Sequence, residues 1–541
     1  MSKLLLSFPQ EFEPNKSQID LLRGIEKAFS SGKKFVIARA PTGSGKSFIS
    51  RTLGNASNEP SPEFSDLINT HQAFKTDQFG EFLHEMECMA EPPCGAFALT
   101  ISKQLQDQYK LQFPETQILK GKGNYKCVVD ENFDVESAPC IFSSKLKNDC
   151  WQTNRCLYYS QRNRSILSKF STLSYSMFLA MPGHVKHRNY IICDEASELE
   201  DELVNRFGIT VDYAKMQIAG LKVKKLVSDK YDNAREWVFT LHHNVVENVE
   251  KLMDKAGNDM SNLSIPERIK LKFLRNQQHQ LETITDLWMN CEFIIDKSAE
   301  KVSVTPLNVN GVSNNIFKYG DKVLLMSATI TRPELFARTL GIKDYEFVEV
   351  GSTFEAKKSP IYISTKNSLN YENMKKNLPI IAAQVQQICD AHPKEKGIIH
   401  THSSDICSYL QEQLKGDRFI FRDEKTNNEQ VLKEHYTSKE PTVIVSPSLG
   451  FGTDLHGDKG RFQIIVKTPF PPLSNKRIKK KFDDDKSWYT DKTINALIQM
   501  SGRCTRSKED HSTTYILDGT SYRLVRDNVN TLPKYFVERI V

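Results

Sequence analysis

The stretch FVIARAPTGSGKS (35–47) decides the fold of this chain, because it joins a strand, a glycine-rich loop and a helix. Its apolar residues at 35–38 indicate a buried strand, and a helical pattern opens after Lys46. A loop that binds phosphate needs glycines, since without side chains they let backbone N–H groups approach the oxygens. A chance Gly/Ser loop is the alternative, and the strand–loop–helix order makes it the weaker one.

The predicted phosphate loop also carries the side chains that a nucleotide needs. Lys46 reaches the β- and γ-phosphates, and the hydroxyl of Ser47 binds Mg²⁺. Ala40 stands where the stricter pattern has its first glycine. The candidate nucleotide-binding residues of this loop are Ala40, Pro41, Thr42, Gly43, Ser44, Gly45, Lys46 and Ser47.

Further apolar runs repeat the strand pattern along the chain. They are YIIC (190–193), VLLM (323–326), GIIH (397–400), VIV (443–445) and FQIIV (462–466). Most are followed by small or polar residues and then by a helical pattern, which predicts an α/β fold with parallel sheets and a site at the strand ends. Two regions break this alternation and indicate insertions: the polar stretch 51–95, and 205–300, which has helical spacing without strand runs.

The composition of the chain indicates the cellular compartment of the protein but does not identify its binding partner. The chain has 541 residues, a net charge of +6 and eleven cysteines. No apolar run approaches a membrane span, and the apolar stretch at the start is too short for a signal peptide. We therefore expect no membrane contact, a reducing compartment and no disulfide framework. The positive charge permits a polyanionic partner without requiring one.

An acidic pair follows the second strand, in CDEASELE (193–200). A carboxylate at a strand end can hold Mg²⁺, often through water, and the next can orient the attacking water. We assign Asp194 to the metal and Glu195 to the water. A solvated acidic loop is the alternative, and the phosphate loop upstream weighs against it.

Near the end of the chain, QMSGRCTR (499–506) carries Gln499, Arg503 and Arg506 on one face of a predicted helix. Two guanidinium groups on one face favour an anion beside them, and an arginine finger pair that reaches the γ-phosphate fits this pattern. A solvent-exposed basic face is the alternative.

Four cysteines lie close together in the sequence: Cys127, Cys140, Cys150 and Cys156. Four thiolates suit an iron–sulfur cluster or a tetrahedral zinc ion, and the absence of a C-x-x-C pair argues against a zinc ribbon. The residues alone do not decide between an iron–sulfur cluster and a zinc ion. Four thiols without a metal are a third alternative. Cys88 and Cys94 form a second close pair, to which we assign no role.

Several of these motifs, in this order, resemble those of superfamily 2 helicases. The set is ARAPTGSGKS (38–47), DEAS (194–197), MSATI (326–330), GTDLHGD (452–458) and QMSGRCTR (499–506). Three further stretches narrow the resemblance to the XPD/DinG family: LKGKGNYKC (119–127), CLYYSQRN (156–163) and VKTPFPPLS (466–474). Together with ALTISKQLQDQ (98–108), the matches cover most of the chain outside the two insertions.

This resemblance implies two RecA-like motor domains that bind ATP and Mg²⁺ between them. It favours a [4Fe–4S] cluster on the four cysteines, with zinc as the alternative. The implied boundaries are 1–120, 166–208 and 301–365 for motor domain 1, 121–165 for the iron–sulfur insertion, 209–300 for a helical arch-like insertion, and 366–541 for motor domain 2. The arch and the cluster domain would border a pore for single-stranded DNA.

The resemblance also assigns roles to single residues. Gln18 matches the glutamine that reads adenine, although a surface glutamine is the alternative. Ser327 and Thr329 match the motif that couples hydrolysis to strand movement, and Asp454 matches a residue that bridges the nucleotide and DNA sites. HTHSS (400–404) matches a motif that touches the DNA backbone. Two positions depart from the family: Ser197 replaces the histidine of DEAH, and Phe451 stands where an acidic residue is common.

These implications predict an ATP-dependent helicase that moves 5′ to 3′ on single-stranded DNA and unwinds forked or tailed duplex DNA, as a monomer. An RNA helicase and an ATP-binding interaction subunit that does not unwind are the alternatives. The basic run NKRIKKKF (475–482) fits a solvated charged loop, a DNA contact or a nuclear localisation signal. We expect a cytoplasmic location, or a nuclear one in a eukaryotic host.

Overall fold

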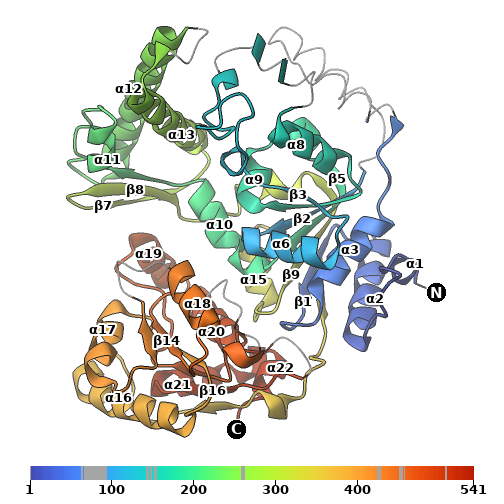
Figure 1. Ribbon diagram of the computed structural model, residues 1–541, viewed down its shortest axis with the longest axis vertical. Helices are drawn as coiled ribbons and strands as arrows, with labels where there is room; N and C mark the ends of the chain where they lie inside the picture. Colours follow the sequence, from blue (N-terminus) through green and yellow to red (C-terminus); the bar gives the residue numbers. More distant parts are fainter. Residues whose placement is uncertain are drawn as a thin grey trace.

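The computed structural model describes residues 2–62, 65, 94–141, 145–146, 149–150, 155–257, 262–422, 428–449, 455, 457–505 and 509–541. Within these residues the chain forms two parallel sheets and one small antiparallel sheet. Figure 1 shows the two parallel-sheet domains one above the other, with the small sheet and two long helices projecting to one side. No helix in these ranges is both long and apolar enough to cross a membrane.

The first sheet is parallel and contains the strand that precedes the phosphate loop. Its strand order is β10 (Tyr345–Glu349), β1 (Phe35–Arg39), β9 (Gly320–Ser327), β5 (Arg188–Asp194), β2 (Ala96–Thr100), β4 (Phe170–Ser174) and β3 (Gln117–Leu119). Side chains alternate across the sheet, so Val36 and Ala38 enter one core while Ile37 enters the other. The result is a three-layer α/β domain.

Helices cover both faces of this first sheet. One face packs against α1 (Lys3–Leu6), α2 (Lys16–Ser30), α3 (Lys46–Ala56) and α6 (Lys103–Gln112). The other packs against α8 (Leu157–Leu167), α9 (Tyr175–Ala180), α10 (Leu199–Arg206), α14 (Asn314–Phe317) and α15 (Pro333–Thr339).

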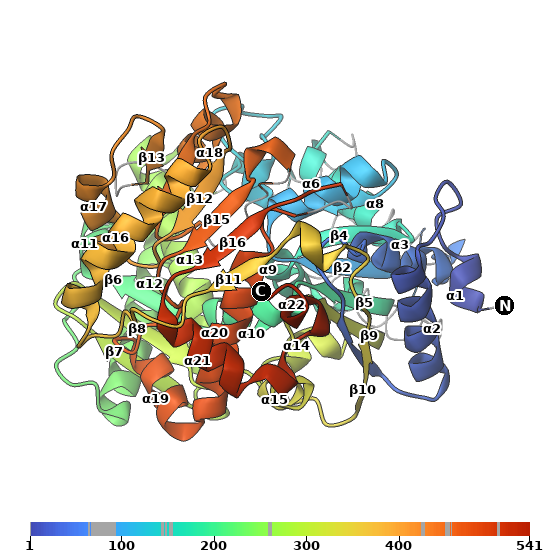
Figure 2. The same ribbon diagram turned by 90° about the horizontal axis from the view of Figure 1, so that it is seen from below.

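The second sheet is also parallel, in the order β11 (Ile361–Ile363), β16 (Thr513–Ile516), β15 (Phe462–Ile465), β12 (Gly397–His400), β14 (Val443–Ser446) and β13 (Phe419–Phe421). Figure 2 shows α16 (Met374–Ala391) and α17 (Ser404–Gln413) on one side, and α20 (Lys486–Ser501) and α21 (Gly519–Asp527) on the other. The remaining helices of this domain are α18 (Asn428–Thr437), α19 (Lys476–Asp484) and α22 (Lys534–Val537).

All six apolar runs identified in the sequence are strands of these two sheets, which confirms the predicted α/β class with two parallel-sheet domains. The second sheet already includes β11, so its first strand precedes the boundary predicted at residue 366.

The insertion after α10 differs from its prediction, because it is not purely helical. Three antiparallel strands, β6 (Ile209–Asp212), β8 (Lys301–Pro306) and β7 (Phe293–Lys297), form its base. The helices α11 (Tyr213–Ile218), α12 (Tyr231–Ala256) and α13 (Ile265–Leu287) pack on this base. The strands are short, and in β8 only alternate residues are buried, so no continuous apolar run marks them.

The described part of the cysteine-rich segment, which omits 142–144, 147–148 and 151–154, has short helical turns and supplies no strand to the three sheets. It holds two short 3₁₀ turns, at Lys122–Asn124 and Pro139–Ile141, before α8 begins at Leu157. Lys272 of α13 forms ion pairs with Asp134 (2.9 Å) and Glu136 (3.1 Å) of this segment. The segment and the arch-like insertion therefore touch directly.

Candidate functional site

The phosphate loop has the backbone that its glycines predict. Gly43 and Gly45 have φ values of 74° and 80°, a left-handed conformation that favours glycine. Gly45 caps the start of α3, so the first turn of that helix opens towards the loop. Lys46 and Ser47 begin the helix, and Ala40 and Ser44 are buried beside them. The strand, loop and helix form as predicted, and the N-terminus of α3 suits a phosphate group.

The acidic pair lies beside the loop lysine. Glu195 Oε1 is 3.3 Å from Lys46 Nζ. Asp194 ends β5, and its carboxylate accepts hydrogen bonds from the hydroxyl of Tyr109 (3.0 Å) and the backbone N–H of Glu195 (3.0 Å). Burial raises the pKa of Asp194 to about 6, Glu195 adds to this, and Lys46 opposes it. A bound cation would favour the charged carboxylate, so this site suits Mg²⁺.

Glu195 has φ of 49°, which is uncommon for a residue with a side chain. The turn it makes begins the short 3₁₀ helix Ala196–Glu198 and directs the carboxylate back towards Lys46. Left-handed backbone at a non-glycine residue often marks a functional site.

Ser197 contacts the MSATI motif, although a histidine stands at its position in the family. Its hydroxyl lies 2.9 Å from that of Ser327, and Ser327 donates to Glu195 Oε2 at 3.4 Å. Ser327 is also 3.4 Å from the hydroxyl of Thr329. Although serine is smaller than histidine, Ser197 and Glu195 are both hydrogen-bonded to Ser327 of β9.

The second domain adds Gln499 and Arg503 to the same cleft. The predicted helix is wrong for Arg503, because α20 ends at Ser501 and Arg503 lies in the turn after it. Glu195, Gln499 and Arg503 line one hollow between α6 and α18. Arg503 is buried, and a side chain at Gly502 would meet the hydroxyl of Thr42 in the phosphate loop. The structure thus brings residues of the two domains together. Arg506 and Asp454, with Phe451 and Cys88, lie outside the described residues.

Gln18 lies next to the phosphate loop. It is 5% exposed, so the alternative of a surface glutamine is wrong. Its Oε1 accepts from the N–H of Asn15 at 2.9 Å, which caps α2. A side chain at Gly45 would clash with its Nε2. The role of Gln18 in reading adenine stays a prediction.

The four cysteines line one small hollow, together with the apolar residues Val128, Val129, Val135, Ala138 and Leu146. Burial raises the pKa of Cys150, and Cys156 and Cys127 nearby raise it further. Within the described residues, no three His, Cys, Asp or Glu side chains are grouped closely enough to hold a metal ion. The four thiols therefore share a hollow without forming a metal site in the described part of this structure, and their role as metal ligands stays a prediction.

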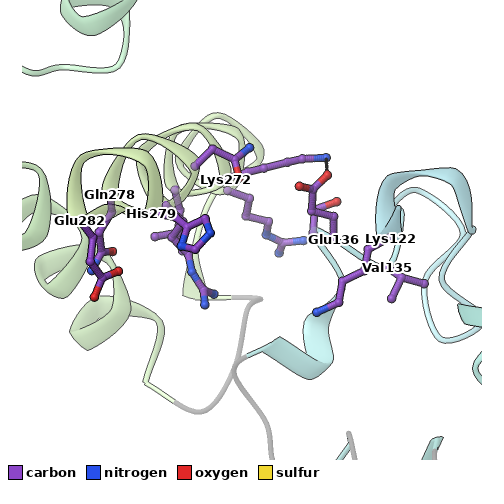
Figure 3. Close-up of a pocket in the computed structure, with 12 residues that line it drawn as sticks. Lys122, Val135, Glu136, Lys272, Gln278, His279 and Glu282 are labelled. Atoms are coloured by element: carbon purple, nitrogen blue, oxygen red, sulfur yellow. Dashed lines mark ion pairs between the residues drawn. The ribbon is translucent and has the colours of Figure 1, made fainter. Parts of the chain in front are cut away.

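A basic pocket lies where the arch-like insertion meets the cysteine-rich segment. Figure 3 shows Lys272 reaching from α13 towards Glu136, with His279 and Glu282 further along the helix. The positively charged or titratable nitrogen groups that line it are Lys122, Arg268, Lys272, Arg275 and His279. Glu136 and Glu282 line the same pocket, and Lys272 is paired with Glu136, so the four Lys and Arg side chains leave a small positive excess. Such an excess suits the phosphate backbone of a nucleic acid.

The basic run after VKTPFPPLS is not a solvated loop, because it forms helix α19. Arg477 and Lys481 are buried and face Glu200 of α10, whose Oε1 is 2.7 Å from Arg477 and 3.7 Å from Lys481. Glu200 Oε2 accepts from the indole N–H of Trp488 at 2.9 Å. Two cations of the run therefore bind the first domain instead of facing a partner.

Sequence reasoning missed Glu200 and Tyr109, which both have partners far along the chain. Glu200 stands within CDEASELE, where it reads as one of several exposed acids. Tyr109 stands one residue beyond ALTISKQLQDQ. Neither residue has a local signal, since only the packing of distant elements makes its role visible.

Comparisons with known proteins agree with this geometry. Residues 385–537 match the family model of the helicase C-terminal domain. No curated protein has significant sequence similarity to the chain.

Solved structures similar to the chain include three of XPD proteins. An XPD helicase matches with a TM-score of 0.57 and 15% identity, over 94% of this chain and 97% of that one. An apo form of XPD matches with a TM-score of 0.55 and 14% identity, over 95% and 98%. S. tokodaii Xpd4 matches with a TM-score of 0.52 and 13% identity, over 96% and 98%. These likenesses show an XPD fold over almost the whole chain.

Proposed function

We propose that this chain is an XPD-like superfamily 2 helicase that uses ATP to move 5′ to 3′ along single-stranded DNA and unwind duplex DNA; its fold and its C-terminal domain support the proposal. One observation carries the proposal: Glu195 of the first domain shares a hollow with Gln499 and Arg503 of the second. A nucleotide bound there would contact both domains, so its hydrolysis would change how they fit together.

Each side chain of this cleft has a role in the proposed hydrolysis. Lys46 binds the β- and γ-phosphates, and Ser47 and Asp194 hold Mg²⁺, which offsets phosphate charge when it is bound. Glu195 orients the attacking water. Arg503 stabilises the charge that develops on the γ-phosphate, with Gln499 beside it and Arg506 as the second predicted finger.

The basic pocket at the arch-like insertion supports a path for the strand. Lys122 and Arg275 lie on its two walls, one from the cysteine-rich segment and one from α13. A phosphate backbone between these walls would be held without regard to base sequence. The four cysteines beside it are proposed to hold a [4Fe–4S] cluster, with zinc as the alternative. This cluster would cross-link the segment that carries the four thiols.

The experiment that tests the proposal measures ATP hydrolysis with and without single-stranded DNA, and strand separation on duplexes with a 5′ tail, a 3′ tail or a fork. We expect DNA to stimulate hydrolysis and the 5′-tailed and forked duplexes to be unwound. Unwinding of only the 3′-tailed duplex contradicts the polarity. Hydrolysis without any unwinding favours an interaction subunit, and stronger stimulation by matched RNA favours an RNA helicase.

Glu195→Gln separates binding from hydrolysis in the same assays. The amide keeps the shape of the side chain but cannot accept a proton, so the variant should retain bound ATP and hydrolyse it slowly. Turnover at the wild-type rate removes Glu195 from its proposed role.

A further inference from the structure

Helix α6 touches the nucleotide site through two side chains that lie one turn apart. Tyr109 and Gln112 are three residues apart, so both point to the same side of the helix. That side faces α3 and the end of β5, where the candidate magnesium ligands Ser47 and Asp194 lie. Neither α6 residue belongs to a motif that the sequence assigns to the nucleotide.

The hydroxyl of Tyr109 joins Asp194 to α3. It lies 3.0 Å from Asp194 Oδ2 and 2.9 Å from the hydroxyl of Ser50. Tyr109 is only 2% exposed, so its hydroxyl is held between these two partners away from solvent. A phenol has one proton, and the carboxylate is the stronger acceptor, so we assign the hydroxyl of Tyr109 as the donor to Asp194.

Gln112 makes the corresponding contact with the second ligand. Its Oε1 accepts a hydrogen bond from the hydroxyl of Ser47. A hydroxyl that donates its proton in this way keeps its oxygen lone pairs for a cation. The contact therefore orients Ser47 for metal binding and does not compete with it.

We propose that Tyr109 and Gln112 are positioning residues for the magnesium ion of the nucleotide site, each orienting one of its two protein ligands. This inference rests on the proposed function, because it assumes that Ser47 and Asp194 hold the ion. Outer partners of metal ligands fix the direction of the donor atoms, and their loss commonly weakens metal affinity by about 10- to 100-fold. Helix α6 is thus part of the metal site although it supplies no ligand to it.

The experiment measures binding of a methylanthraniloyl derivative of the non-hydrolysable ATP analogue AMP-PNP, titrated in EDTA and at increasing Mg²⁺. It needs no turnover, so it reports on the site and not on activity. In Tyr109→Phe and Gln112→Leu we expect about a tenfold higher Mg²⁺ concentration at half-saturation. In EDTA, the affinity of both variants for the AMP-PNP derivative should stay near the wild-type value, because Tyr109 and Gln112 contact the proposed metal ligands and not the backbone of the phosphate loop.

Two further variants serve as controls. Ser50→Ala removes the other partner of the Tyr109 hydroxyl and should leave the Mg²⁺ titration near that of the wild type. Gln112→Glu keeps an oxygen acceptor for Ser47 and should restore most of the Mg²⁺ affinity lost in Gln112→Leu. If Tyr109→Phe does not fold, the two Gln112 variants decide the question, since that side chain is only partly buried.

The outcomes are distinguishable. Wild-type titrations in which Mg²⁺ does not tighten nucleotide binding overturn the proposed site itself. If Mg²⁺ tightens nucleotide binding equally in the wild type, Tyr109→Phe and Gln112→Leu, this inference is wrong but the proposed nucleotide site still stands. Equal losses with and without Mg²⁺ also overturn it, because they indicate general damage to the site.

Discussion

Glu200 of α10 and Arg477 of α19 form an ion pair of 2.7 Å across the boundary between the two motor domains, and each side chain is only 6% exposed. Lys492 lies 3.5 Å from the other oxygen of the same carboxylate. The buried carboxylate of Glu200 therefore forms ion pairs with cations from two helices of the second domain. Glu200 lies five residues after Glu195, so this contact adjoins the proposed catalytic pair.

We expect Glu200→Ala to destabilise the protein by about 3–5 kcal/mol, because it leaves buried cations without their partner. Calorimetric unfolding measures the change. Asp201→Ala is the matched control, since Asp201 also pairs with Lys492 but is 52% exposed, and it should cost less than about 1 kcal/mol. Equal effects of the two variants would contradict a special role for the buried carboxylate.

The contribution of Glu200 should depend on pH. Burial acts to raise its pKa, but Lys492, Arg477 and Lys481 outweigh burial and lower it to about 2 from the ordinary 4.5. A lowered carboxylate pKa stabilises the fold above the unfolded value and loses this effect as pH falls towards the folded value. The difference in melting temperature between wild type and Glu200→Ala should be constant from about pH 6 to 8 and shrink below about pH 4.5. A difference that grows in acid contradicts the ion pair.

Lys46→Ala should lower ATP hydrolysis by at least about 100-fold, because it removes the cation that is proposed to bind the γ-phosphate and that lies 3.3 Å from Glu195. Binding of single-stranded DNA should change little, since Lys46 belongs to the nucleotide cleft. A coupled ATPase assay and fluorescence anisotropy with labelled DNA measure the two effects. Lys343→Ala, at an exposed position of the same domain, is the control. Hydrolysis near the wild-type rate in Lys46→Ala is the result that rejects this active site.

Ser197→Ala should uncouple hydrolysis from movement. It removes the 2.9 Å contact with Ser327, a buried hydrogen bond worth about 1 kcal/mol, or about fivefold in an equilibrium. We expect ATP hydrolysis within about threefold of wild type but more ATP consumed per base pair unwound. Ser197→His, which installs the histidine of the family, should keep the coupling. An unchanged ratio in Ser197→Ala would show that the route through Ser327 carries no coupling.

Protein purified without oxygen should contain about four iron and about four acid-labile sulfide per chain. Serine at Cys127 or Cys156 should lower both together, because each thiol lines the same hollow. Serine at Cys389, a buried cysteine on α16, is the control and should leave the iron content unchanged. One zinc per chain without sulfide favours the zinc alternative and removes support for the cluster.

The sequence predicted those elements that are determined by their own residues. The loop at Gly43 and Gly45 and the apolar runs of the two sheets need only their own residues to be recognised. The base of the arch-like insertion was missed because β6 and β8 pair across about ninety residues and neither forms an apolar run on its own. Likewise, the importance of Glu200 arises from helices that follow it by nearly three hundred residues. Sequence motifs therefore predict the residues of the candidate active site. The contacts between the domains can be recognised only in the folded structure.

The base of the arch-like insertion contacts both motor domains. Its strands β6 and β8 continue directly from the first motor domain, whereas Lys476 of α19 reaches its base from the second domain, through Asp229 and the carbonyl oxygen of Ile295. We therefore expect a rotation between the motor domains to act on this base from two sides. The long helices above the base connect it to the Lys272 ion pairs, which lie beside the basic pocket.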